Sequence, residues 1–208
     1  MTGLMVLLII VNGAISTFNA WYVGNVWPER QEMPWPLRWV VYASVTMSAC
    51  GFTWCYLMAV GLATEALRSN QLPVLHYVND IPPSAINALM SLGYLAIILP
   101  VIGSGLVITA HAWSVAWRRR SFSNVAVAGW DSFAQIYNVI EAVEFIPEAL
   151  SSVVNFFRSD DEEDWGYWVL VALLVLLIGG VLTTSLIVRL SARGHVRRVQ
   201  ARYQSRFA

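Results

Sequence analysis

Glu141, Glu144 and Glu148 are the acidic residues whose spacing points most directly to a chemical role. Steps of three and four residues place their carboxylates on one broad face of a helix. The surrounding segment 131–157 contains no basic residue. A carboxylate that faces lipid costs several kcal/mol, so such a face must meet water, arginine or another protein. We expect it to dock a partner or, alternatively, to line a cation path.

Residues for catalysis or metal binding are sparse. The histidines are His76, His111 and His195. No two of them have the spacing of a helical zinc site. His76 and Asp80 are four residues apart and could form a base with its orienting carboxylate, but no nucleophile is near, so a local hydrogen bond is the better interpretation. Ser104 lies in Gly-Ser-Gly, which does not match the hydrolase motif. We therefore expect a non-enzymatic protein with no metal or other cofactor.

The composition indicates that these residues are positioned by helices in a membrane. Hydrophobic residues make up 57% of the 208-residue chain and charged residues only 12%, with a mean hydropathy of +0.57. A soluble domain carries about twice that share of charge. The sequence predicts an all-α integral membrane protein with about four transmembrane helices, plus an amphipathic helix between the third and fourth spans.

Four apolar runs are long enough to cross a bilayer. They cover Leu4 to Val23, Trp39 to about Leu67, Ser84 to Trp117 and Trp165 to Leu190. The first run lacks the basic residues that begin a signal peptide, so we expect it to be retained. The predicted organisation is a three-span membrane region (1–117), a connecting segment (118–164), a fourth span (165–190) and an arginine-rich helical tail (191–208).

The third run is too long for one straight span and contains Pro100, Gly103 and Gly105 near its middle. Proline removes a backbone hydrogen bond, and glycine lets a neighbouring helix approach closely. We predict a kinked or locally unwound helix at Pro100, with both glycines packed against a neighbour. These three residues would form a hinge.

The segment from Asp131 to Phe157 has the alternation of an amphipathic helix. We expect Asp131 or Ser132 to cap it and Pro147 to bend or restart it. The apolar stripe consists of Phe133, Ile136, Ile140, Val143, Ile146, Leu150 and Val154. The polar stripe consists of Gln135, Asn138, Glu141, Glu144, Glu148, Ser152 and Asn155.

All 13 basic residues are arginines, and ten of them follow residue 117. The anchors expected to meet lipid headgroups or a partner are Arg118, Arg119, Arg120, Arg193, Arg197 and Arg198. We expect a cell-membrane location, a cytoplasmic tail and no nucleic-acid partner. Only one certain span separates the two arginine clusters, so either one cluster lies outside or the amphipathic segment also crosses. We favour four spans, with the amphipathic segment at the surface or in water.

Small and polar residues form strips along three of the spans, at Asn12/Ser16/Asn19, Ser44/Ser48/Gly51, and Gly179/Gly180/Thr183/Thr184. Such strips pack helices together, within one protomer or between protomers. Cys50 and Cys55 are five residues apart on different helix faces, so we expect no disulfide between them.

The leading functional prediction is a non-enzymatic membrane subunit that forms a homo-oligomer or docks a partner through its amphipathic segment and arginine tail. The alternative is an oligomeric ion channel or pore-forming effector, in which the three glutamates line the path and Pro100 to Gly105 is the hinge.

Overall fold

The computed structural model describes residues 2–69, 80–159 and 163–207, and nearly all of them are helical. The helices are α1 (Thr2–Val26), the short 3-10 helix η1 (Trp27–Glu29), α2 (Trp35–Ser69), α4 (Pro83–Arg119), α5 (Phe122–Arg158) and α6 (Glu163–Phe207). No strand occurs within these ranges. The all-α prediction is confirmed.

Four of the helical segments are long and apolar enough to cross a membrane: Gly3–Glu29, Trp35–Arg68, Pro83–Arg119 and Trp165–Val199. They correspond to the four spans expected from the sequence. α5 is as long as α4, at 37 residues, but its polar residues keep it outside this set.

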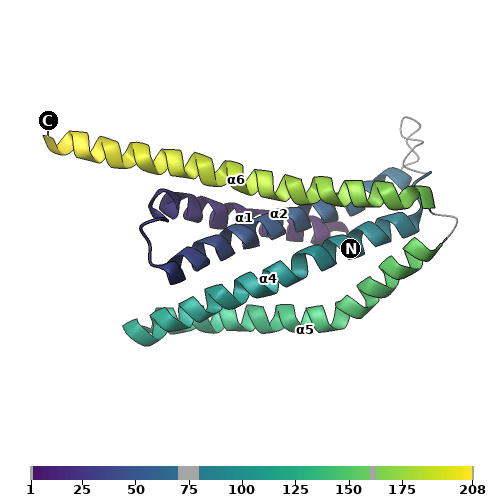
Figure 1. Cartoon of the computed structure of the whole chain (residues 1–208), viewed down its shortest axis with the longest axis horizontal. Helices are drawn as coiled ribbons and strands as arrows, with labels where there is room; N and C mark the ends of the chain where they lie inside the picture. Colours follow the sequence, from purple (N-terminus) through teal and green to yellow (C-terminus); the bar gives the residue numbers. More distant parts are fainter. Residues whose placement is uncertain (1, 70–79, 160–162, 208) are drawn as a thin grey trace.

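The long helices run roughly alongside one another in an antiparallel bundle (Figure 1). α2 is central and packs on α1, α4 and α6, whereas α5 packs almost wholly on the outer side of α4. One end of the bundle holds the α1–α2 connection, the α4–α5 turn and the carboxyl end of α6 (Figure 1). We call it the basic end, because it carries both arginine clusters.

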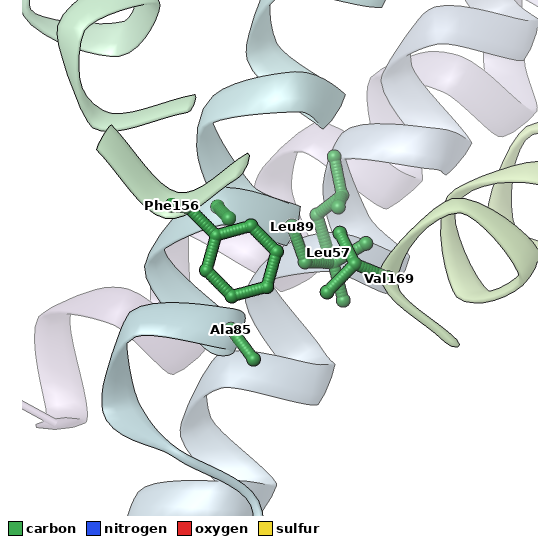
Figure 2. Close-up of a cluster of buried hydrophobic side chains, with 6 residues drawn as sticks. Leu57, Ala85, Leu89, Phe156 and Val169 are labelled. Atoms are coloured by element: carbon green, nitrogen blue, oxygen red, sulfur yellow. The ribbon is translucent and has the colours of Figure 1, made fainter. Parts of the chain in front are cut away.

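Two buried clusters hold the bundle together. Figure 2 shows the one that joins four helices, with Leu57 of α2, Leu89 of α4, Phe156 of α5 and Val169 of α6 as members of one cluster. Ala85 and Ala88 of α4 complete it. The second cluster joins α1, α2 and α6 through Ala20, Val23, Val41 and Val188.

α4 continues without interruption from Pro83 to Arg119 and contains Pro100 in its interior. The predicted local unwinding at Pro100 is therefore wrong. Membrane helices tolerate proline where neighbouring elements compensate for the lost backbone bond, and α4 has neighbours on several sides. α5, which contains Pro147, is the helix that changes direction along its length (Figure 1). Interior proline is the usual cause of such a bend.

The expected cap of α5 was also wrong. The helix begins at Phe122, and the Ser121 hydroxyl accepts a hydrogen bond from the Asn124 backbone N–H at 3.3 Å. Neither Asp131 nor Ser132 is a cap, because both lie inside the helix. Only residues 120 and 121 separate α5 from α4, so the chain reverses directly.

Arg120 makes this reversal in the left-handed region, with φ of 46°, and its backbone N–H donates to the Ala116 carbonyl at 2.9 Å. A left-handed residue commonly ends a helix in this way, and glycine is the usual choice. Arginine pays about 1–2 kcal/mol for the same conformation.

Candidate assembly surface and the contacts that present it

α5 is fixed on α4 by a seam of residues at intervals of seven. Its buried members are Ala128, Gln135, Ala142, Ala149 and Phe156. A repeat of seven keeps one side of a helix against its neighbour over many turns, as in coiled coils. Three of the five are alanine, which allows the two backbones to approach closely.

Gln135 is the polar member of this seam, and its amide Nε2 donates to the Ile102 carbonyl of α4 at 2.9 Å. Gly105 provides the room, since a Cβ there would lie 1.9 Å from Oε1 of Gln135. A second bond between the helices runs from Trp113 Nε1 to the Ser132 hydroxyl, at 2.8 Å. Gly103 is different: an added Cβ would meet nothing within 4 Å, so its predicted packing is wrong.

Glu144 and Glu148 are exposed and Glu141 is half-buried. We call these three residues the glutamate face. Glu144 lies opposite the seam, whereas Glu141 and Glu148 flank it, and Glu141 interacts electrostatically with Tyr94 of α4. In the described residues, the one close contact between a basic and an acidic side chain joins His195 and Glu29 at 3.9 Å, so no described arginine of this chain pairs with the glutamate face.

The predicted apolar stripe of α5 is also outward-facing. Phe133, Ile136, Ile140 and Val143 are 58–72% exposed, and Leu150 and Val154 are exposed to a lesser degree. The stripe adjoins the glutamate face rather than packing on the bundle. α5 therefore presents lipid-compatible and acidic surfaces side by side.

Arginines collect at the basic end. Arg118, Arg119 and Arg120 lie at the α4–α5 turn, and Arg193, Arg197 and Arg198 lie on α6. All six side chains are exposed. The side chains of Arg202 and Arg206 fall outside the described part of the tail.

α6 is tied to α1 near this end. Arg198 Nη2 donates to the Asn25 side-chain oxygen at 3.0 Å, and the Ser191 hydroxyl donates to the Trp21 carbonyl at 2.7 Å. The helices approach so closely that a Cβ on Gly24 would lie 2.5 Å from Cβ of Ser191. α6 is also one unbroken helix, so residue 190 is no boundary in secondary structure.

The polar strips of the spans make contacts within one chain. Asn12 Nδ2 donates to the Gly51 carbonyl at 3.1 Å. The Tyr56 and Thr183 hydroxyls are 2.6 Å apart, which joins α2 to α6. Gly180 faces Thr53, whose Oγ1 would lie 2.2 Å from an added Cβ. These strips are thus used for folding the protomer.

The other candidates show no assembled site. No group of three His, Cys, Asp or Glu residues that could hold a metal occurs among the described residues. Cys50 and Cys55 are free and buried, which confirms that no disulfide joins them. His76 lies outside the described residues, so its expected pairing with Asp80 is not part of the structure. His111 lines a hollow with Trp35 and Trp39 of α2.

Together, the fold and the site define a class: a helical bundle with four membrane-length helices and an unpaired acidic face on a fifth helix. Comparisons with protein-family models, with curated proteins and with solved structures find no match to this chain. The proposed function therefore rests on the chemistry of the glutamate face.

Proposed function

We propose that the protein is a non-enzymatic membrane subunit that docks a partner membrane protein through the glutamate face of α5. The observation that carries the proposal is the exposure of Glu144 and Glu148 on a helix that lies lengthwise along α4. α4 is one of the four membrane-length helices. A helix packed along it shares its depth, and carboxylates at that depth need a partner.

The proposal includes a fifth crossing. The two-residue turn at 120–121 leads α5 straight back along α4, and Phe156 near its far end packs with Leu89 and Val169. α5 as a fifth span brings both arginine clusters to the same side, which removes the conflict between them. The exposed apolar stripe of α5 would then face lipid, which suits its composition.

The charge distribution supports an orientation with the basic end in the cytoplasm. This end carries Arg118, Arg119 and Arg120 together with the α6 arginines, whereas α6 begins with Glu163 and Asp164 at the opposite end. Arginines near the ends of spans favour the cytoplasmic side. In this orientation the tail of α6 is cytoplasmic, where it can add contacts to a docked partner.

The favoured occupant is a different protein that carries arginine or lysine within its own transmembrane segment. In a two-fold dimer built on α5, Glu144 and Glu148 would approach the same residues of the second copy at the same depth. Like charges repel there, and α5 has no basic residue between positions 122 and 157 to offset them. A basic partner helix forms charge-assisted hydrogen bonds with the same face instead.

The test is the size of the native complex. The full-length tagged protein is extracted from its own membranes in native nanodiscs, and its mass is measured by size exclusion with light scattering. We expect Glu144→Gln/Glu148→Gln to lose the partner and run at the mass of the free subunit. Glutamine keeps the size and helix propensity of glutamate but removes its charge.

The matched control is Glu32→Gln/Glu65→Gln, which removes two exposed carboxylates near the ends of helices rather than from α5. It should keep the native mass. Raised salt should weaken the wild-type complex, because ion pairs with partial access to water are screened. A Glu144/Glu148 variant that keeps the native mass at low and high salt refutes the docking role.

The channel alternative is favoured by one observation, the spacing of the three carboxylates along α5, since rings of carboxylates select cations in pores. Ion flux through liposomes that contain the purified protein separates the two functions. Cation flux that disappears in Glu141→Gln/Glu144→Gln/Glu148→Gln, with the mass of the assembly unchanged, would replace docking with conduction.

A further inference from the structure

We infer that the hollow at the α4–α5 turn binds the phosphate headgroup of an anionic phospholipid. The hollow measures about 380 Å³ and is lined by Trp113, Ala116, Trp117, Arg120 and Val125. It lies where α4 ends and α5 begins, at the basic end of the bundle. This inference is independent of what docks on the glutamate face.

The backbone of Arg120 lies in the left-handed region, with φ of 46°. Among the described residues it is the only non-glycine with positive φ. Glycine would make the same turn without steric cost, so the backbone gains nothing from arginine. An arginine held in an unfavourable conformation at the rim of a hollow is explained by what its side chain binds.

The arginines beside the hollow carry positive charge that no described acidic residue compensates. Arg118, Arg119 and Arg120 are exposed and have no ion pair within the described residues. α4 contains no acidic residue at all, and the first one in α5 is Asp131. The positive partial charge at the amino end of α5 acts in the same direction. A phosphate near Arg120 therefore meets positive potential from the three arginines and from the amino end of α5, and the full charges of the arginines exceed the negative partial charge at the carboxyl end of α4.

The apolar lining of the hollow favours a lipid over a free anion. Trp113, Trp117 and Val125 give the hollow an apolar wall, which a small hydrated anion does not need. Trp117 is 78% exposed and the adjacent Phe122 is 90% exposed. Aromatic side chains of this kind belong at the level of lipid headgroups. A basic pocket at a helix end with an apolar wall matches a phosphate that carries acyl chains.

A second hollow at the basic end, lined by Arg198, Ser191 and Trp21, is less suited to phosphate. The Arg198 guanidinium already donates to Asn25 and to the Gly194 carbonyl. The contact between Glu29 of η1 and His195 of α6 also places a carboxylate nearby. The α4–α5 hollow has no such competition from described residues.

The experiment measures lipid binding to the full-length protein in detergent by native mass spectrometry, with phosphatidylglycerol and phosphatidylcholine as probes. We expect wild type to retain phosphatidylglycerol more strongly. Arg120→Gly should weaken that binding about tenfold, because it removes a charge-assisted contact. The variant should fold at least as well as wild type, since glycine relieves the strained backbone.

Arg193→Gln is the matched control, because it removes an exposed arginine from the same end of the bundle but away from the hollow. It should leave phosphatidylglycerol binding unchanged. Equal losses in Arg120→Gly and Arg193→Gln would overturn the site and indicate diffuse attraction. Equal retention of the two lipids by wild type would also overturn it.

Two further measurements complete the test. Trp117→Leu keeps all three arginines but loses the aromatic wall, and it should weaken phosphatidylglycerol binding several-fold. Inorganic phosphate, added at the concentration of the lipid, should fail to displace it. Displacement by inorganic phosphate would show that the site takes a free anion, and the lipid assignment would be withdrawn.

Discussion

The side chain of Gln135 occupies the space that a side chain at position 105 would need. Its Oε1 would lie 1.9 Å from a Cβ on Gly105, while its Nε2 donates to the Ile102 carbonyl at 2.9 Å. The glycine and the glutamine thus form one unit that locks α5 onto α4. The position of the glutamate face depends on this contact, because all three glutamates lie on α5.

Gly105→Ala should therefore destabilise the protein by about 1–3 kcal/mol, because the added methyl must displace Gln135 and break its bond to α4. Thermal unfolding in detergent measures the effect. Gly103→Ala is the control: its methyl enters open space, and alanine should stabilise the helix by up to about 1 kcal/mol. Equal effects of the two substitutions would contradict the packing of Gln135 against Gly105.

Gly24→Ala should loosen the attachment of α6 to α1. The new Cβ would meet Cβ of Ser191 at 2.5 Å and the Val188 carbonyl at 2.7 Å, and a backbone carbonyl cannot move aside cheaply. We expect a loss of about 2 kcal/mol in thermal unfolding. Gly194→Ala, which meets nothing within 4 Å, should be neutral or stabilising.

Thr184→Val should leave the fold intact and raise its stability by about 1 kcal/mol, because a buried hydroxyl without a partner costs free energy that valine does not. Thr184 is 1% exposed, and its hydroxyl has no hydrogen-bond partner among the described residues. The measurement is again thermal unfolding. A marked loss of stability would mean that the hydroxyl is bonded in the folded protein.

Cysteine labelling should report five crossings. A cysteine at position 204 and one replacing Ser123 should both be shielded from an impermeant reagent outside intact cells, whereas one replacing Ser159 should react. Native Cys50 and Cys55 are buried and should stay silent. Opposite labelling of positions 123 and 204 would leave α5 outside the bilayer, and labelling of position 204 would put the tail on the outer side.

The four helices of membrane length were predictable from the sequence, because long uncharged runs leave few alternatives to apolar helices. The cross-helix bond from Asn12 also followed the expectation for polar residues within spans. The small-residue strips were also recognisable, because small residues within apolar helices usually mark close helix packing. Gly180 lies in such a strip and packs closely against Thr53.

The placement of α5 was not predictable. Its exposed stripe is the more hydrophobic one, so periodicity alone suggested a surface helix, whereas the packed seam consists largely of alanine and one glutamine. Ser121 was a detectable cap, but the helix was predicted to begin at Asp131 or Ser132, where the amphipathic alternation starts. Pro100 was given too much weight, because the context of neighbouring helices decides whether proline interrupts a helix.

Because α6 is one continuous helix, its tail is a rigid extension of fixed length. Its 45 residues extend about 68 Å, more than twice the roughly 30 Å of a bilayer's hydrocarbon core. Figure 1 shows its carboxyl end reaching beyond every other helix. In the proposed membrane orientation, a partner bound at its tip is held at a fixed height and rotational angle relative to the membrane. One inserted residue near position 200 would turn the tip by about 100°, whereas seven would lift it by about 10 Å and nearly restore its direction.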